Sequence, residues 1–502
     1  MTISNFILSI KNSFVYLIFL LFSLYQVNAQ PNNNFDIVII NGRVIDPETK
    51  LDAIRNIGVK DGRIVSITSE SIKGNEVIDA ENMVVAPGFI DLHVHGRDNK
   101  EQEYQVHDGV TTALELEWGI EFLDQWYTSR ENKALINYGA SVNWPFERFL
   151  TFGKMESQIN ALKEDANSGK LDITAVLNKL QPTFKETADE YQIEQTKENI
   201  KSSLAAGGIG IGIPIGYLPG ALPEEVYRIY QFAAELDVPV FSHIREGGII
   251  AVQQAISDAV LSGAALHIVH MNSMALGEIE AAIEMVNRAQ SLGYPITTEV
   301  YPYTAASTAI ESAIFDGDWQ DRLAISYEDV QWVETGERLT SNNFERFRDK
   351  GGVVIIHMMK PEWIQFGIGA PNTIIASDGM PFSPLAHPRT AGTFSRVLGK
   401  YVREEKTLGL VEAIKKMTLL PAKVIEHVVP SMRFKGRIQI GTDADITIFD
   451  PLHIKDKATF TEGLAFSEGI HYVIVNGQIV IREKKTVQNV FPGKPVYGKY
   501  RR

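Results

Sequence analysis

Residues 86–95 read Ala-Pro-Gly-Phe-Ile-Asp-Leu-His-Val-His, and this stretch decides how the rest of the chain is interpreted. Its apolar run predicts a strand, with His93 and His95 two residues apart at the end. Side chains two apart on a strand point to the same side. Two neutral imidazoles that face one point suit a divalent transition metal. The stretch therefore predicts a strand that ends in part of a metal site.

Beyond Pro87, short β-branched runs alternate with amphipathic segments. Continuous apolar strands separated by helices are typical of a parallel sheet covered on both faces. With residues 89–93 as the first of about eight or nine strands, we expect a (β/α)8 barrel of the TIM type over residues 87–429. Residues 312–350 interrupt the rhythm and predict an insertion, with a lid as one interpretation. The other expected strands cover residues 109–116, 134–142, 208–213, 238–241, 265–269, 296–300, 352–357 and 373–376.

Short strands with turn signals flank the barrel on both sides. The pairs Asn41-Gly42 and Asp61-Gly62 are typical of tight hairpins, and Asn476-Gly477 repeats the signal near the other end. We expect residues 30–86 and 430–490 to build one small β-sandwich. The predicted fold class is thus α/β, a barrel with a sandwich made from both chain ends.

The first 29 residues have the layout of a signal peptide. Lys11 precedes an apolar stretch over residues 14–24, and small residues at 27 and 29 precede Gln30. We expect cleavage there and an exported protein, periplasmic or extracellular. The alternative is an uncleaved membrane anchor, although so short an apolar stretch would barely span a bilayer. After cleavage, no membrane association is expected.

Composition excludes several kinds of partner and site. The formal net charge of −14 disfavours nucleic acid and anionic membranes, because neither would be attracted. The chain has no cysteine, which excludes disulfides, thiolate metal ligands and a cysteine nucleophile. The 11 histidines are therefore the natural candidates for metal ligands.

Further candidate ligands follow later strands. His243 comes just after the strand at 238–241, and His270 closes the next one. Asp378 ends the last apolar strand beside a glycine. Because the carboxyl ends of barrel strands meet at one mouth, we expect these groups to gather there. His267 is opposite in strand phase to His270 and is interpreted as a structural or supporting residue.

These motifs resemble the amidohydrolase superfamily and, more narrowly, the N-acyl-D-amino-acid deacylases, or D-aminoacylases. The similarity rests on the stretch at 87–95, on Ser-His-Ile-Arg-Glu at 242–246, on His270 and on Ser-Asp-Gly at 377–379. It continues through residues 387–399, 416–422 and 436–445 and so covers nearly the whole mature chain.

The resemblance implies a zinc-dependent hydrolase with one or two ions and assigns a role to each matching residue. His93, His95, His243 and His270 match the metal histidines, and Asp378 matches a ligand or general base. Arg389 matches the arginine that grips a substrate carboxylate. The implied substrate contacts are Tyr217, in the similar segment at 207–220, and Tyr301 or Tyr303.

Two departures from that family alter the expectations. D-aminoacylases carry a metal-binding cysteine near the end of the second strand, where this chain has Glu115 and Glu117. Two carboxylates inside an apolar strand are expensive to bury unpaired, so we expect Glu117 to bridge the metals, with Glu115 as the alternative. The family also places a substrate-contacting lysine two residues after the histidine at 270. Asn272 stands there instead and is the expected substrate contact, and the lost charge puts D-amino-acid specificity in doubt.

The expected reaction is hydrolysis of a non-peptide amide bond by a zinc-activated water, with removal of the acyl group from N-acyl-D-amino acids as the leading prediction. The expected partner is a small molecule that bears a carboxylate; the sequence leaves the oligomeric state open. A cyclic-amide hydrolase of the hydantoinase or dihydroorotase kind and an exported dipeptidase are the alternatives. A metal-free barrel that only binds is the alternative of a different class, and metal analysis would separate it.

Overall fold

A computed structural model describes residues 35–153, 156–167, 176, 179–380, 383 and 385–502. The signal peptide expected at residues 1–29 lies outside this part of the chain. Within the described ranges, no helix combines the length and apolarity needed to cross a bilayer.

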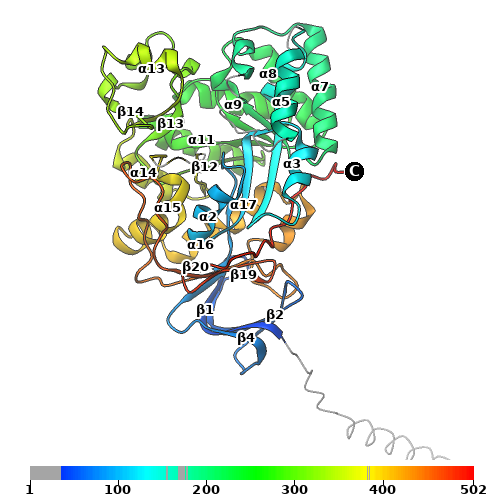
Figure 1. The fold of residues 1–502 in the computed structure, drawn as a ribbon, viewed down its shortest axis with the longest axis vertical. Helices are drawn as coiled ribbons and strands as arrows, with labels where there is room; N and C mark the ends of the chain where they lie inside the picture. Colours follow the sequence, from blue (N-terminus) through cyan, green and yellow to red (C-terminus); the bar gives the residue numbers. More distant parts are fainter. Residues whose placement is uncertain (1–34, 154–155, 168–175, 177–178, 381–382, 384) are drawn as a thin grey trace, which may run out of the picture.

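Eight parallel strands form the centre of the molecule (Figure 1). They are hydrogen-bonded in the order β16-β12-β11-β10-β9-β8-β7-β6, and a bridge between Val94 and Gly379 joins the two edges just beyond the strand ends. The sheet thus closes into a barrel, and the expected fold class is confirmed. The strands are β6 (Phe89–Asp91), β7 (Val110–Ile120), β8 (Asn137–Asn143), β9 (Ile211–Pro214), β10 (Val240–His243), β11 (Leu266–Ile268), β12 (Ile296–Val300) and β16 (Ile374–Ile375).

Helices follow the strands and cover the outside of the barrel. Most have an apolar stripe against the strands and a charged face toward solvent, as in α8 and α11. The helices outside the insertion are α2 (Asn99–His107), α3 (Leu123–Arg130), α4 (Trp144–Phe149), α5 (Glu156–Asn167), α7 (Glu190–Ala205), α8 (Pro223–Glu235), α9 (Ile249–Ser262), α10 (Met271–Ala275), α11 (Ile279–Ser291), α14 (Pro361–Gly369), α15 (Arg389–Arg396), α16 (Leu410–Met417) and α17 (Leu419–Ile425).

A nine-stranded sheet is built from both ends of the chain. In Figure 1 the early strands β1, β2 and β4 lie at the foot of the molecule beside the late strands β19 and β20. The two sets join where β5 pairs antiparallel with β17. Its strands are β1 (Phe35–Asp46), β2 (Leu51–Lys60), β3 (Arg63–Thr68), β4 (Gly74–Asp79), β5 (Val84–Pro87), β17 (Ile446–Phe449), β18 (Ile470–Val475), β19 (Gln478–Arg482) and β20 (Lys485–Thr486).

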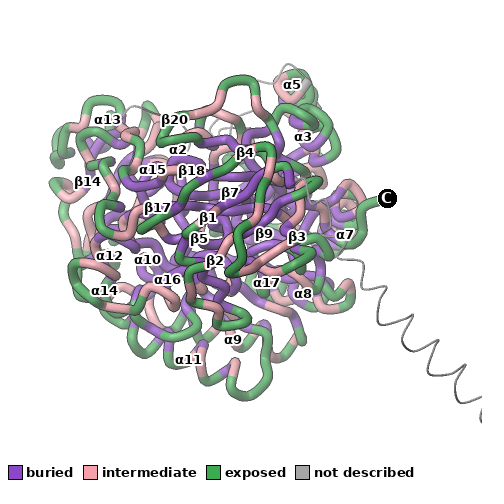
Figure 2. Tube along the Cα trace, turned by 90° about the horizontal axis from the view of Figure 1, so that it is seen from below, coloured by how far each residue is buried: buried purple, intermediate pink, exposed green. Residues whose placement is uncertain are grey.

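The interior of the molecule is continuous. Figure 2 shows the buried residues concentrated at the centre, where barrel and sandwich strands meet. A buried contact at this junction joins Asp445 to Lys435, to the Asn137 side chain of the barrel and to the Asn476 backbone of the sandwich. The two parts therefore share polar as well as apolar contacts.

Residues 306–356 form a small unit with its own core, which is wider than the insertion expected at 312–350 and is called the insertion below. It contains a three-stranded antiparallel sheet, α12 (Trp319–Leu323) and α13 (Phe344–Lys350), packed around Trp319 and Trp332. The prediction of a barrel strand at 352–357 is wrong, because this segment is the central strand of that sheet. An apolar run followed by a helix looks the same in both settings. The strands are β13 (Ala306–Ala309), β14 (Val330–Trp332) and β15 (Val353–Ile356).

The last residues of the chain run along the amino-terminal ends of the barrel strands. The amides of Gly493, Val496 and Gly498 donate to carbonyls that lie just before or within β8 and before β9. The C-terminal segment therefore lies on the opposite side of the barrel from the strand ends that carry the predicted ligands.

Candidate metal centre

The barrel brings the predicted histidines and carboxylates to one point at the carboxyl ends of its strands. His93 and His95 follow β6, Glu117 lies near the end of β7, and His243 is the last residue of β10. All are buried, with exposures of 6% or less. Segments distant in sequence thus converge because parallel strands end at a common mouth.

Glu117 lies at the centre of this cluster. Its Oε2 is 3.0 Å from Nε2 of His93 and 3.3 Å from Nε2 of His95. Its Oε1 is 3.0 Å from Nδ1 of His243 and 3.4 Å from Nε2 of His270. One carboxylate therefore faces two pairs of imidazoles, which is the placement a ligand shared by two ions requires.

Asp378 completes the cluster from the last strand. Its Oδ1 is 3.5 Å from Nε2 of His93 and 3.3 Å from Nε2 of His95. The backbone of Asp378 has φ of 52°, and that of His270 has φ of 33°. Such left-handed backbone is unfavourable for residues other than glycine and is concentrated at functional sites. The fold thus holds both side chains at the centre at some conformational cost.

Glu115 has a different place from Glu117. Its Oε2 is 2.9 Å from Nδ1 of His95, and its Oε1 accepts the amide of Trp118. It therefore contacts the side of the His95 ring that faces away from the cluster. Of the two carboxylates that the sequence left open, Glu117 has the bridging geometry and Glu115 that of an orienting partner.

The donor set fits divalent cations. His93, His95 and Asp378 offer ligand atoms within 4.8 Å of one another, and so do His93, Glu117 and His270. These are nitrogen and oxygen donors of the kind that zinc accepts. The two groups share His93, whose Nε2 has a single lone pair and can bind one ion at a time.

The pKa values of the clustered side chains are shifted by their mutual contacts. Burial lowers the pKa of His93, but neighbouring carboxylates, above all Asp378 and Glu299, raise it well above its ordinary value. Burial alone would raise the pKa of Asp378, yet the Arg389 guanidinium and the imidazoles hold it well below its usual range. Burial alone would likewise raise the pKa of Glu117, but hydrogen bonds with His243, His270 and His93 hold it well below its usual range. A divalent cation held by these residues would lie beside ionised carboxylates.

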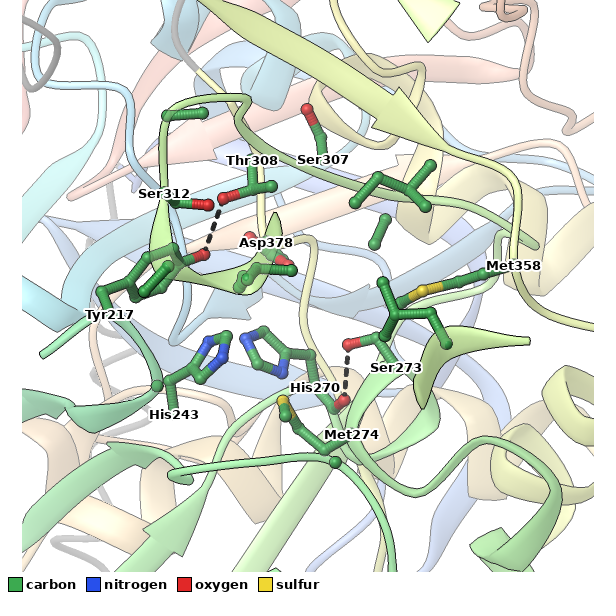
Figure 3. Close-up of a pocket in the computed structure, with 18 of the residues that line it drawn as sticks. Tyr217, His243, His270, Ser273, Met274, Ser307, Thr308, Ser312, Met358 and Asp378 are labelled. Carbon is green, nitrogen blue, oxygen red and sulfur yellow. Dashed lines mark hydrogen bonds between the residues drawn. The ribbon is translucent and has the colours of Figure 1, made fainter. Parts of the chain in front are cut away.

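A cavity of about 870 Å³ opens directly above the cluster. His243, His270 and Asp378 form part of its wall, and Thr308 of the insertion lies across from them (Figure 3). The Thr308 hydroxyl is hydrogen-bonded to the Tyr217 hydroxyl at 3.1 Å. The cavity has the size of a small-molecule site and is closed on one side by the insertion.

The remaining predicted substrate contacts take two kinds of position. Tyr217 lines the cavity, and its ring lies 4.8 Å from that of His243. Asn272 is fully buried and exchanges hydrogen bonds with the backbone of Tyr301. Tyr303 is also buried and contacts Asp456. The structure thus brings Tyr217 to the substrate space and places the other three in the wall behind it.

Arg389 also lies behind the cavity surface. Its guanidinium is 2.9 Å from Asp378 through Nη1 and stacks over the Tyr301 ring at 4.8 Å. With 1% exposure, it contacts the predicted general base directly. Glu299, which no motif singled out, is equally buried and touches both His93 and His267. The sequence signal for Glu299 is a carboxylate within a β-branched strand, two residues before Tyr301.

The chain is similar in sequence and in fold to known amidohydrolases. A family model described as "Amidohydrolase family" matches residues 254–481. An N-acyl-D-glutamate deacylase from Alcaligenes xylosoxydans xylosoxydans is 28% identical over 88% of this chain and 93% of its own. A D-aminoacylase from the same organism is 27% identical over 91% and 96%. The crystal structure of a Bordetella bronchiseptica N-acyl-D-glutamate deacylase, complexed with zinc and a phosphonate inhibitor, superposes with a TM-score of 0.76 at 24% identity. It covers 92% of this chain and 100% of that one.

Proposed function

We propose, from the confirmed resemblance to the amidohydrolase superfamily, that this chain is a zinc-dependent hydrolase that removes the acyl group from N-acyl-D-amino acids. The observation that carries the proposal is the convergence of four imidazoles and Asp378 around Glu117 at the base of the cavity. The comparisons support the reaction class, since similar curated proteins are deacylases. Zinc is the expected metal because the donor set suits it.

The reaction adds water across the carbon–nitrogen bond of an amide. When bound, zinc supplies Lewis acidity, which polarises a carbonyl group and makes water more acidic. Asp378 is placed to take a proton from the attacking water and to return it to the departing nitrogen as the bond breaks. The products are a carboxylate and a free amine. Asp378 is placed for both steps because its carboxylate faces the imidazole cluster and lines the cavity.

The substrate is proposed to bear a carboxylate. Guanidinium groups suit carboxylates because their planar fork donates two parallel hydrogen bonds. Arg245 and Arg322 line the cavity, and Arg389 lies behind Asp378. The apolar side chains of Ile314 and Met358 line the same space and suit an acyl group or an apolar amino-acid side chain.

The test is a substrate panel with the zinc-loaded mature chain. N-acetyl-D-amino acids, their L-enantiomers, hydantoin, dihydroorotate and dipeptides are compared by the amine or acid released. We expect release of free D-amino acids and a loss of at least about 100-fold in kcat for Asp378→Asn. The Tm of that variant checks that it is folded. Cleavage of a cyclic amide or dipeptide in preference would replace the proposed substrate class. Absence of both stoichiometric metal and hydrolysis would identify a binding protein instead.

We also propose that the mature protein works outside the cytoplasm. The support is the sequence of residues 1–29, with its basic start, apolar centre and small residues before Gln30. Expression of the full chain in a bacterial host, followed by fractionation and intact mass measurement, tests it. A product that begins at Gln30 in the exported fraction is expected. A full-length product retained in the cytoplasm contradicts the proposal.

A further inference from the structure

The two nitrogens of the His93 ring face different groups. Nε2 points into the cluster of candidate metal ligands, 3.0 Å from Oε2 of Glu117. Nδ1 points the other way and is 2.5 Å from Oε1 of Glu299. An imidazole that binds a metal through one nitrogen must carry its proton on the other. Glu299 is the acceptor for that proton.

The second oxygen of Glu299 is also engaged. Oε2 is 2.9 Å from Nε2 of His267, and Nδ1 of His267 is 2.8 Å from the Thr297 hydroxyl. An ionised carboxylate only accepts hydrogen bonds, so both histidines donate to it. His267 then has Nδ1 free to accept from Thr297. The result is a chain of three hydrogen bonds from Thr297 to His93.

Barrel strands hold the residues of this row of hydrogen bonds in place. Thr297 and Glu299 are two residues apart on β12, so their side chains share a face. His267 lies on β11 and is the backbone partner of Thr297 in the parallel register. His93, Glu299 and His267 have exposures of 0%, 1% and 1%. Groups on packed strands keep a geometry more accurately than groups on loops.

We propose that Thr297, His267 and Glu299 form a positioning relay for the metal centre. The relay holds His93 with its proton on Nδ1 and Nε2 directed at the metal, and Glu299 adds negative charge behind that ligand. Thr297 and His267 fix the carboxylate so that it cannot rotate away. The inference rests on the metal centre of the proposed function. It concerns residues that do not touch the substrate.

The relay explains why a carboxylate is tolerated so deep in the barrel. A buried, ionised carboxylate is strongly unfavourable unless hydrogen bonds and a nearby positive charge compensate it. Two imidazole N–H groups supply the hydrogen bonds, and a divalent cation beyond His93 supplies the charge. His95 has a corresponding partner in Glu115, so both histidines of the first strand are oriented by carboxylates. Mutation of such partners typically weakens metal binding about 10- to 100-fold.

The test measures zinc affinity directly, by competition of the metal-free protein with a chromophoric chelator. Glu299→Ala removes both hydrogen bonds and the charge, and we expect zinc to bind about 10- to 100-fold more weakly. Glu299→Gln retains the shape but not the charge, and a loss of about tenfold is expected. His267→Ala leaves the contact between Glu299 and His93 intact, so its effect should be the smallest. The visible spectrum of the cobalt-substituted protein should shift in the same order.

Glu147→Gln is the matched control. Glu147 is buried on α4, accepts a hydrogen bond from Ser203 at 2.5 Å, and belongs to none of the candidate metal groups. Its substitution should change Tm but leave zinc affinity and the cobalt spectrum unchanged. If Glu299→Ala and Glu299→Gln bind zinc as tightly as this control, the relay is refuted. If the variants lose zinc as expected while the wild type cleaves no amide, the relay stands and only the proposed reaction fails.

Discussion

Glu115 and Glu117 lie two residues apart on one strand, yet their carboxylates face different groups. Glu117 lies among four imidazoles, while Glu115 contacts only the outer nitrogen of His95 and a backbone amide. Strand periodicity puts both side chains on the same face but does not set their depth. The sequence therefore left two candidates for the bridging ligand, Glu115 and Glu117. The positions of the histidines on the other strands distinguish between them.

Substitution of each glutamate tests this difference in role. Glu117→Gln removes the charge that faces both pairs of histidines, so we expect loss of at least one zinc ion per chain. Glu115→Gln keeps a hydrogen-bond acceptor beside His95, so it should lose less zinc than Glu117→Gln. Atomic absorption on purified protein measures both. Equal loss in the two variants would contradict the assignment of Glu117 as the bridging ligand.

Arg389 is a second residue whose role depends on its contact rather than on its motif. The resemblance assigns it to a substrate carboxylate, while the structure pairs it with Asp378. If the pairing orients Asp378, Arg389→Ala should lower kcat about 10- to 100-fold with little change in KM. Arg389→Lys, which keeps the charge without the fork, should recover part of the loss. Steady-state kinetics on one N-acyl-D-amino acid measures this. A rise in KM with kcat unchanged would support the carboxylate role instead.

The convergence of the four histidines and Asp378 could be predicted from the sequence because each follows an apolar run at a strand end. Glu299 could not, since it lies within a strand and its contact with His93 spans 206 positions. No local pattern shows which interior side chain lies behind a given ligand. Packing between non-adjacent strands determines that contact, and only the closed barrel supplies it.

At the scale of elements, the barrel strands and the strands from both chain ends follow the predicted pattern, and the segment at 352–357 does not. Its apolar run, Val353–Ile356, is followed by α14, as a barrel strand would be. It pairs antiparallel with β13 and β14 instead. Periodicity reports burial and strand type but not the partner of a strand. Ser307 and Thr308, on the strand that pairs with this segment, line the cavity. A fold with residues 352–357 in the barrel would therefore not have predicted this part of the cavity wall.

The end of α2 meets the sandwich at His107. The ring stacks on Phe466 with centroids 3.8 Å apart, and Nε2 donates to the Thr486 hydroxyl at 2.9 Å. Burial lowers the pKa of His107 to about 4. In the unfolded chain the imidazole has its ordinary pKa of about 6.5. As pH falls from about 6.5 to 4, the unfolded chain therefore takes up a proton that the folded protein excludes, and stability falls.

This linkage predicts a pH-dependent effect of His107→Gln. The wild type should lose about 2 kcal/mol relative to the variant between pH 7.5 and pH 5, since one pKa unit corresponds to about 1.36 kcal/mol. Urea unfolding of both proteins at the two pH values measures the difference. If the free energy of unfolding changes equally with pH in the wild type and the variant, His107 is not the source of the pH dependence.

At the scale of the whole molecule, the two chain ends are joined to the barrel around Asp445. Lys435 donates to Asp445 at 2.6 Å and to Asp443 at 2.9 Å, and the lysine is 4% exposed. Asn137 and Asn476 bind the same carboxylate from the barrel and from the sandwich. The sequence predicted a sandwich from both flanks but gave no sign of this buried junction, since its members are 308 positions apart.

Removal of the lysine should destabilise the whole molecule. Lys435→Met leaves the buried Asp445 carboxylate without its cation, while Asp443 keeps Arg63, and we expect a loss of about 3–5 kcal/mol in the free energy of unfolding. Lys201→Met is the control, because Lys201 pairs with Glu198 on the exposed face of α7. Its effect should be within about 0.5 kcal/mol. Denaturant unfolding measures both. A small change for Lys435→Met would mean that this junction contributes little to stability.

The position of the C-terminal segment has a practical consequence for immobilised enzyme. Because the amides of residues 493–502 pair with the chain just before and within β8 and before β9, a linker added after Arg502 starts near the barrel end opposite the metal centre. A bead or electrode coupled there would face the base of the barrel and leave the mouth turned toward solution. Substrate access should then be the same on the support as for the free protein.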